Sequence, residues 1–156
     1  LKASKNDSMF RKAIEREDRF DVFSETTEKP SELINIAFYA PLKGLISDSF
    51  NIQNEHFGVD VLAAENQAIK ASLGGTVVFS DWTSETGYSI AIQHDNNLIS
   101  FYKHNSVLLK KTGELVKAGD VIAIIGNSGE FSSGPHLHFE MWHKGKAIDP
   151  EHHILF

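Results

Sequence analysis

From Ile36 onward, short apolar runs alternate with turn-forming residues, and this pattern constrains the fold more than any other feature of the chain. Gly, Asn, Asp and Ser separate the runs, which are short enough for strands and rich in β-branched and aromatic residues. The pattern predicts strands at 59–64, 76–80, 89–93, 98–102, 121–125 and 137–142. It also predicts a hairpin turn at Asp95-Asn96-Asn97. The expected fold class is therefore mostly β, with an antiparallel sheet.

Outside the predicted strands, the sequence predicts a helix near the N-terminus and a loop and a short closing segment toward the C-terminus. Apolar residues such as Phe10, Ile14 and Phe20 fall near a 3.6-residue period between positions 8 and 23, which predicts an amphipathic helix that packs on the body of the fold. We expect residues 1–35 to be an N-terminal helical segment, the end of a longer upstream region, and residues 36–156 to form the main domain. The polar stretch 110–119 is predicted to be a loop, and 149–156 a short closing segment.

Composition excludes several classes of function. The 156 residues fit one domain, and 41% of them are hydrophobic, enough for a core. A net charge of −6 argues against a nucleic-acid partner, because binding phosphates needs clustered Lys and Arg. No apolar run approaches the roughly 20 residues of a membrane-spanning helix. Since Leu1 is not a natural start, we expect that a secretion signal, an anchor or an upstream domain has been removed.

The chain has no cysteine and eight histidines. Disulfides and thiolate zinc sites are therefore excluded, and any metal must be held by His, Asp or Glu. The sequence His136-Leu137-His138 lies on a predicted strand, where residues two apart point to the same face. Both imidazoles can then reach one point, while Leu137 faces the other side.

A second candidate pair is His56 and Asp60, in His56-Phe57-Gly58-Val59-Asp60. Gly58 and the β-branched Val59 disfavour a helix here, and Val59 begins a predicted strand. The two residues are either part of an ordinary loop or converge if the backbone bends at Gly58. The sequence of this segment alone leaves both interpretations open.

Taken together, the two motifs indicate a zinc site. Zinc enzymes commonly use three protein ligands and leave the fourth position to water, and His56, Asp60 and His138 make such a set. His136 would then lie beside the metal without binding it, where a histidine is suited to proton transfer. His104, at the end of a predicted strand, is the second candidate of this kind. The other histidines are interpreted as surface residues: His94, His143, His152 and His153.

These motifs resemble the LytM-type (lysostaphin-like, M23) metallopeptidase family. The resemblance rests on His56-x-x-x-Asp60, on Tyr102-x-His104 and on the segment Gly134-Pro135-His136-Leu137-His138-Phe139-Glu140, in this order and spacing. The supporting segments 75–78 and 116–129 also match, so that the resemblance covers about 38–150. It implies a mostly antiparallel, barrel-sandwich-like β fold with a groove above the metal.

The resemblance also implies a function. It places Zn²⁺ on His56, Asp60 and His138, and makes His104 and His136 the catalytic pair of a metalloendopeptidase. The family hydrolyses peptide bonds in the stems or cross-links of bacterial peptidoglycan, by attack of a zinc-activated water, which implies a location in the cell envelope, periplasmic or extracellular. Some relatives lose ligands and act as non-enzymatic activators, whereas this chain has all five site residues.

Two segments depart from the family pattern. Phe50-Asn51-Ile52-Gln53 stands where many members have Phe-Gly-x-Arg, and Lys103-His104-Asn105 where many have Gly-His-Leu. Both lie where the substrate would be recognised. Glu140 follows His138 by two residues, so it is either an acceptor that orients a ligand or a solvated charge.

Two other functions compete with the enzyme. The first is a LytM-like binding module that recruits or activates another cell-wall hydrolase. The second is a lipoyl- or biotinyl-like carrier domain, suggested by 75–78 together with 116–122. The carrier requires a Lys between two hydrophobic residues at a hairpin tip, which the sequence lacks, and it would leave five histidines without a role.

Overall fold

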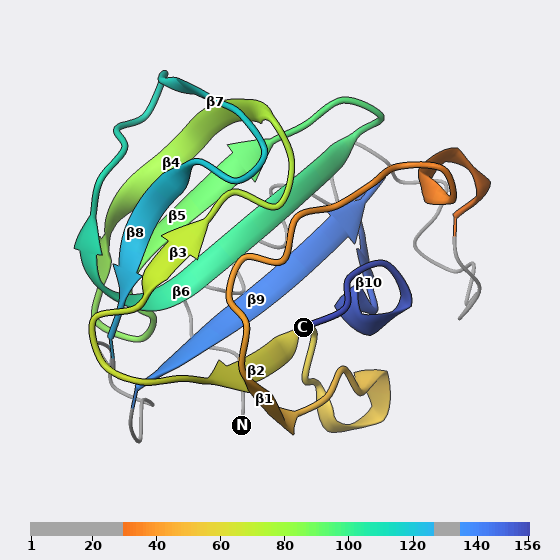
Figure 1. Ribbon diagram of the computed structural model, residues 1–156. Helices are drawn as coiled ribbons and strands as arrows, with labels where there is room; N and C mark the ends of the chain where they lie inside the picture. Colours follow the sequence, from red (N-terminus) through yellow and green to blue (C-terminus); the bar gives the residue numbers. More distant parts are fainter. Residues whose placement is uncertain (1–29, 127–134) are drawn as a thin grey trace.

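A computed structural model describes residues 30–126 and 135–156, and the helix predicted at 8–23 lies outside these residues. The described residues form ten strands (Figure 1): β1 Leu45–Asp48, β2 Val59–Leu62, β3 Ala68–Lys70, β4 Gly75–Thr83, β5 Gly87–Gln93, β6 Leu98–Leu108, β7 Leu115–Val116, β8 Val121–Ile125, β9 His136–His143 and β10 Lys146–Ile148. Three short 3₁₀ turns accompany them: η2 Ser31–Leu33, η3 Ile52–Asn54 and η4 Pro150–His152.

All pairings among these strands are antiparallel, in the order β1-β2-β9-β6-β5-β4-β7. β10 adds to β9, and β8 joins both β3 and the end of β6. The mostly β, antiparallel fold class predicted from the sequence is confirmed.

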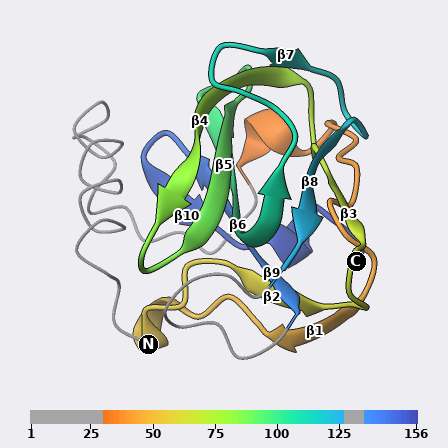
Figure 2. The ribbon, with the colours of Figure 1, turned by 90° about the vertical axis from the view of Figure 1, so that its left-hand side faces the viewer.

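The sheet folds back over itself. In Figure 1, β3 and β8 lie in front of β5 and β6, and in Figure 2, turned by 90°, they lie to the right of these strands. The core fills the space between the two layers. It includes Ile69 from β3, Ile122 from β8, Ile90 from β5 and Tyr102 from β6, each with 0% of its surface exposed.

Alternation along β9 separates the core from the opposite face. Leu137, Phe139 and Met141 are fully buried in the core cluster. Residues 136, 138, 140 and 142 therefore point to the other face of the sheet, because successive side chains of a strand alternate. A smaller apolar cluster around Phe101 and Trp142 lies on this second face.

Most predicted strands lie within the observed ones, but β6 and β4 are longer than expected. β6 continues to Leu108, six residues beyond its predicted end, and carries His104 within it. The hairpin turn is confirmed: His94 N–H donates to Leu98 O at 2.8 Å, and Asn96 and Asn97 have φ angles of 63° and 55°. The loop predicted at 110–119 is partly wrong, since β7 pairs with β4 there.

Both ends of the described chain pack onto the core. Leu33 and Ile154 are 1% and 6% exposed, and Phe156 contacts Phe139 with ring centroids 6.1 Å apart. The closing segment at 149–156 thus packs as expected, through η4. Across 30–126 and 135–156, no helix has the length and hydropathy needed to cross a membrane.

Candidate metal centre

β2 and β9 place Asp60 directly opposite His138. The two residues are register partners in this antiparallel pair. Because the alternation on β9 turns Leu137 into the core, His138 points away from it, toward Asp60. The sequence pattern predicted this face of β9 correctly, but the pairing with β2 joins residues 78 positions apart.

His56 is held just before β2 by its backbone and its ring. It forms a two-way bridge with Asn51, whose N–H donates to His56 O at 2.8 Å and whose carbonyl accepts from His56 N–H at 2.9 Å. The ring Nδ1–H donates to the carbonyl of Ser49 at 2.7 Å. This segment and β9 thus bring together the three residues that sequence spacing selected.

Gly58 allows β2 to start against β9, for a reason that differs from the bend expected from the sequence. Gly58 is not among the described residues with a positive φ angle. A Cβ at this position would lie 2.3 Å from the carbonyl oxygen of Phe139 and 2.7 Å from Cγ of Glu140. The glycine is required for close approach of the two backbones rather than for a left-handed conformation.

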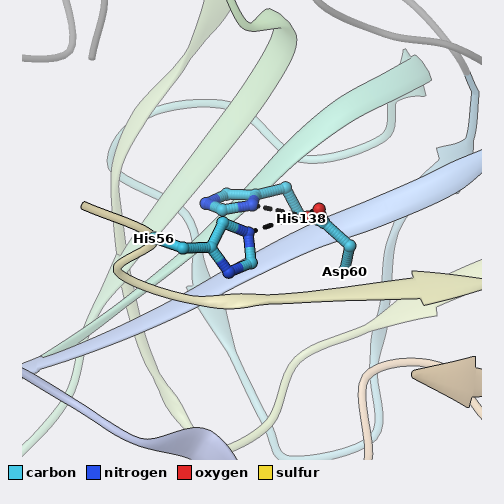
Figure 3. Close-up of side chains that lie close together, drawn as sticks. All are labelled: His56, Asp60 and His138. Atoms are coloured by element: carbon cyan, nitrogen blue, oxygen red, sulfur yellow. Dashed lines mark hydrogen bonds and ion pairs between the residues drawn. The ribbon is translucent and has the colours of Figure 1, made fainter. Parts of the chain in front are cut away.

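The side chains of His56, Asp60 and His138 converge on one point (Figure 3). Asp60 Oδ1 lies 2.7 Å from His138 Nδ1, and Asp60 Oδ2 lies 3.3 Å from His56 Nε2. One potential ligand atom from each residue lies within 4.8 Å of the other two. Two imidazoles and a carboxylate are a donor set that suits zinc where thiolates are absent.

One atom in this group supports a metal directly. Nδ1 of His56 must donate its proton to Ser49, because a carbonyl can only accept, so Nε2 of the neutral ring carries a lone pair. Nε2 is buried, lacks a hydrogen bond among the described residues and lies 3.3 Å from the Asp60 carboxylate. A lone pair beside a carboxylate is an unfavourable arrangement, which a proton on Nε2 or a metal cation between the two atoms would relieve. The residues therefore fit a metal ion.

Asp60 shifts the pKa values of His56 and His138 toward the charged forms, and the two histidines do the same for Asp60. Burial lowers the pKa of His138, but hydrogen bonds to Asp60 and Glu140 outweigh burial and raise this pKa to about 9. For His56, burial also lowers the pKa, while Asp60 and the Ser49 carbonyl raise it, with a net increase. Burial raises the pKa of Asp60, but the two histidines hold it well below its usual range. The carboxylate is therefore ionised and available as a ligand.

His104 and His136 lie beside this group. Their ring centroids are 4.9 Å apart, and the ring of His104 is 6.1 Å from that of His138. His136 starts β9, whereas His104 is a buried residue within β6. His104 has a φ angle of 68°, and its N–H leaves the ladder to donate to Thr86 O at 3.0 Å. A non-glycine residue in the left-handed region is costly, and such residues are concentrated at functional sites.

Three further charged residues lie around the centre, and of these Asp48 was missed in the sequence analysis. Asp48 on β1 has Oδ2 3.6 Å from His56 Nε2, and Lys103 lies 3.2 Å from Glu140. Glu140 is not a solvated charge: it is 1% exposed, and its Oε2 lies 2.6 Å from His138 Nε2. The two-residue spacing from His138 had pointed to Glu140, and the departure from the family pattern had singled out Lys103, though not for this contact, whereas Asp48 gave no signal.

Two of the four histidines interpreted as surface residues are buried. His94 is 5% exposed, with Nδ1 donating to Gly74 O at 2.8 Å and Nε2 2.7 Å from Ser100 Oγ. His143 is 7% exposed, with Nε2 3.3 Å from Glu32 Oε2. Both predictions were wrong because burial was decided by packing partners distant in sequence. His152 is exposed, as expected, and His153 is half-buried.

Comparison with known proteins identifies the family. The model of peptidase family M23 matches residues 54–150, which include the whole candidate centre. The chain belongs to peptidase family M23. This confirms the LytM-type, lysostaphin-like resemblance that the histidine motifs carry.

Relatives of this M23 chain have names of different kinds. It is 33% identical to outer membrane antigenic lipoprotein B of Haemophilus influenzae over 123 residues, covering 77% of this chain and 30% of the relative. It is 34% identical to murein hydrolase activator NlpD of Escherichia coli over 113 residues, covering 70% and 29%. The chain thus spans less than a third of the length of these relatives.

A solved structure shares the M23 fold. A zinc containing peptidase from Vibrio cholerae superposes with a TM-score of 0.67 at 28% identity, covering 73% of this chain and 39% of that one. M23 relatives thus include proteins named as peptidases and proteins named as activators of hydrolases.

Proposed function

We propose that this domain is a zinc-dependent endopeptidase that cleaves peptide bonds in the stem peptides or cross-links of peptidoglycan. The observation that carries the proposal is the convergence of His56, Asp60 and His138 on one point. His104 and His136 lie in contact beside them. A structural metal site would not require two further histidines at its edge.

In this proposal His56 Nε2, a carboxylate oxygen of Asp60 and His138 Nδ1 would hold Zn²⁺. The chemistry that zinc would supply there is Lewis-acid polarisation of the scissile carbonyl and a pKa of water lowered toward about 7. The protein's own residues orient these donors: the Ser49 carbonyl fixes the tautomer of His56, and Asp60 is kept ionised by the two rings.

We assign proton transfer and stabilisation of the oxyanion to His104 and His136. One ring accepts the proton of the attacking water and returns it to the leaving amine, a role that suits histidine near neutral pH. The other donates a hydrogen bond to the oxygen that becomes negative, a contact worth on the order of 3 kcal/mol. The backbone of β6 at His104 is in the left-handed region, an unfavourable conformation of a kind found most often at functional sites.

The names of the relatives support a substrate and a location. Murein is peptidoglycan, and the relatives are named as an outer membrane lipoprotein and a murein hydrolase activator. We therefore propose a location in the cell envelope, periplasmic or extracellular. We also propose that the domain is part of a longer protein that carries an anchor or export signal upstream.

The second candidate is a non-enzymatic module that recruits or activates another cell-wall hydrolase. The relatives named as murein hydrolase activators favour it. The complete set of ligands and flanking histidines favours the enzyme, since an activator does not need donors aligned for a metal.

Digestion of purified peptidoglycan separates the two candidates. The enzyme should release new amine termini with added zinc, and a chelator should abolish this release. His152→Ala, an exposed histidine outside the centre, serves as the matched control and should keep full activity. An absence of new amine termini at every pH, combined with stimulation of a second hydrolase, would instead establish the activator.

A further inference from the structure

Glu140 is a buried carboxylate with a specific set of donors. It follows His138 on the same face of β9 and is 1% exposed. Its Oε1 accepts from Trp142 Nε1–H at 2.8 Å, and its Oε2 lies 2.6 Å from His138 Nε2 and 3.2 Å from Lys103 Nζ. A buried charge is tolerated only where it is paired and hydrogen-bonded, and these contacts meet that requirement.

The contact with Glu140 decides which nitrogen of His138 faces the metal centre. Nε2–H is directed at Glu140 Oε2, which leaves Nδ1 at 2.7 Å from Asp60 Oδ1. A ring flipped by half a turn would direct carbon atoms at both carboxylates. Histidine ligands commonly hold their other nitrogen in this way, and the acceptor fixes both tautomer and ring orientation.

Lys103 provides the counter-charge for Glu140. It is the register partner of His138 on β6 and is only 6% exposed. Its ammonium lies 3.2 Å from Glu140 Oε2 and 5.8 Å from the centre of the Phe101 ring, so the pair is buried against apolar and aromatic surface. Without Lys103, the carboxylate would be a buried charge beside a histidine, and desolvation would favour its movement away from that position.

We propose that Glu140, held in place by Lys103 and Trp142, is the positioning residue of the metal centre, and that the Lys103–Glu140 pair sets the affinity of this protein for zinc. The inference rests on the proposed zinc function of His56, Asp60 and His138. It assigns a role to Lys103 at one of the positions where the chain departs from the family pattern.

Zinc affinity tests the proposal without using peptidase activity. Glu140→Gln keeps the shape of the side chain and removes its charge, and it should raise the zinc dissociation constant by about 10- to 100-fold in competition with a chelator. Lys103→Met should shift the constant in the same direction by less, because Trp142 still holds Oε1, and Lys103→Arg should restore it. Glu151→Gln, at an exposed site, is the matched control.

Folding must be separated from positioning. If Glu140→Gln prevents folding because it removes the carboxylate that faces the buried ammonium of Lys103, the double variant Lys103→Met/Glu140→Gln removes both charges and should show the same weak zinc binding. Unchanged zinc affinity in a folded Glu140 variant overturns the proposal.

A metal-free measurement distinguishes this inference from the proposed function. In ¹⁵N NMR of the metal-free protein, the Nε2–H proton of His138 should be protected and shifted downfield by Glu140, and Glu140→Gln should weaken both effects. If the wild-type protein binds no zinc but the NMR effect is present, the proposed function fails and the role of the pair in zinc affinity fails with it, while the orientation of the His138 ring by Glu140 stands. If the NMR signal is identical in both proteins, the positioning role is wrong.

Discussion

His94 is buried and His138 is half-buried, and each has a partner on both ring nitrogens, yet their surroundings differ in charge. His138 lies between the carboxylates of Asp60 and Glu140. His94 lies between the carbonyl of Gly74 and the hydroxyl of Ser100. Hydrogen bonds to the carboxylates raise the pKa of His138 to about 9 despite burial, whereas burial lowers the pKa of His94.

The difference separates a ligand from a structural residue. A neutral His94 satisfies all its neighbours, because Nδ1 donates to a carbonyl and Nε2 accepts from Ser100. It continues a buried chain through Ser100 Oγ to the Tyr102 hydroxyl at 2.7 Å, and Tyr102 also bonds Ser72. Around His138, two carboxylates face one ring, and one of them, Asp60, is also a donor that a metal cation could bind. Burial alone does not make a histidine functional; the charge of its partners does.

The largest expected effect separates catalysis from metal binding. His104→Ala and His136→Ala should each lower kcat/KM on a peptidoglycan peptide by about 100- to 10,000-fold, because each removes a group that moves a proton or stabilises charge. Both variants should keep stoichiometric zinc, measured by metal analysis of the same samples. Loss of zinc from either variant would place that histidine among the ligands instead.

The next effect concerns stability rather than activity. His94→Ala removes two buried hydrogen bonds and leaves a cavity, so the free energy of unfolding should fall by about 2–4 kcal/mol. Denaturant unfolding measures this change, with His152→Ala as the control. Zinc content and kcat/KM of the folded His94 variant should equal those of the wild type. Loss of zinc at His94→Ala would break the comparison, since it would make both His94 and His138 part of the site.

The smallest expected effect concerns how the free energy of unfolding of the metal-free protein depends on pH. The contributions of His94 and His138 should change with pH in opposite directions. The folded-state pKa of His94 is below the ordinary 6.5, so its stabilising contribution is present above pH 6.5 and is lost as the pH falls below that value. The folded-state pKa of His138 is about 9, so its contribution is complete below 6.5 and is lost as the pH rises from 6.5 through about 9.

Denaturant unfolding across this pH range measures both contributions. The difference between wild type and His94→Asn should grow with rising pH, and the difference between wild type and His138→Asn should shrink, each by at most about 1.4 kcal/mol per pH unit. If both differences in the free energy of unfolding changed with pH in the same direction, the charges around His94 and His138 would not differ in the way described.

The sequence predicted the parts of the site that depend on local spacing. Alternation on a strand placed His136 and His138 on one face, and the i, i+4 spacing of His56 and Asp60 was compatible with convergence. The register that sets Asp60 opposite His138 joins segments distant in the sequence. Local patterns were compatible with this register but could not predict it.

The remaining details had no local signal. The strand predicted at 98–102 ended at Tyr102, with His104 at its end, but pairing with β9 and β8 extends β6 to Leu108. The left-handed backbone at His104 and the burial of His94 and His143 depend on partners elsewhere in the chain. Because these contacts join segments that are distant in the sequence, a local sequence pattern does not predict them.

Metal analysis of purified protein tests the central claim most directly. After loading with zinc and removal of excess, wild type and His94→Ala should each retain one zinc ion per chain, and His138→Ala should retain none, because it removes one ligand and the partner of Asp60. Stoichiometric zinc in folded His138→Ala would contradict the assignment of His56, Asp60 and His138 as the metal centre.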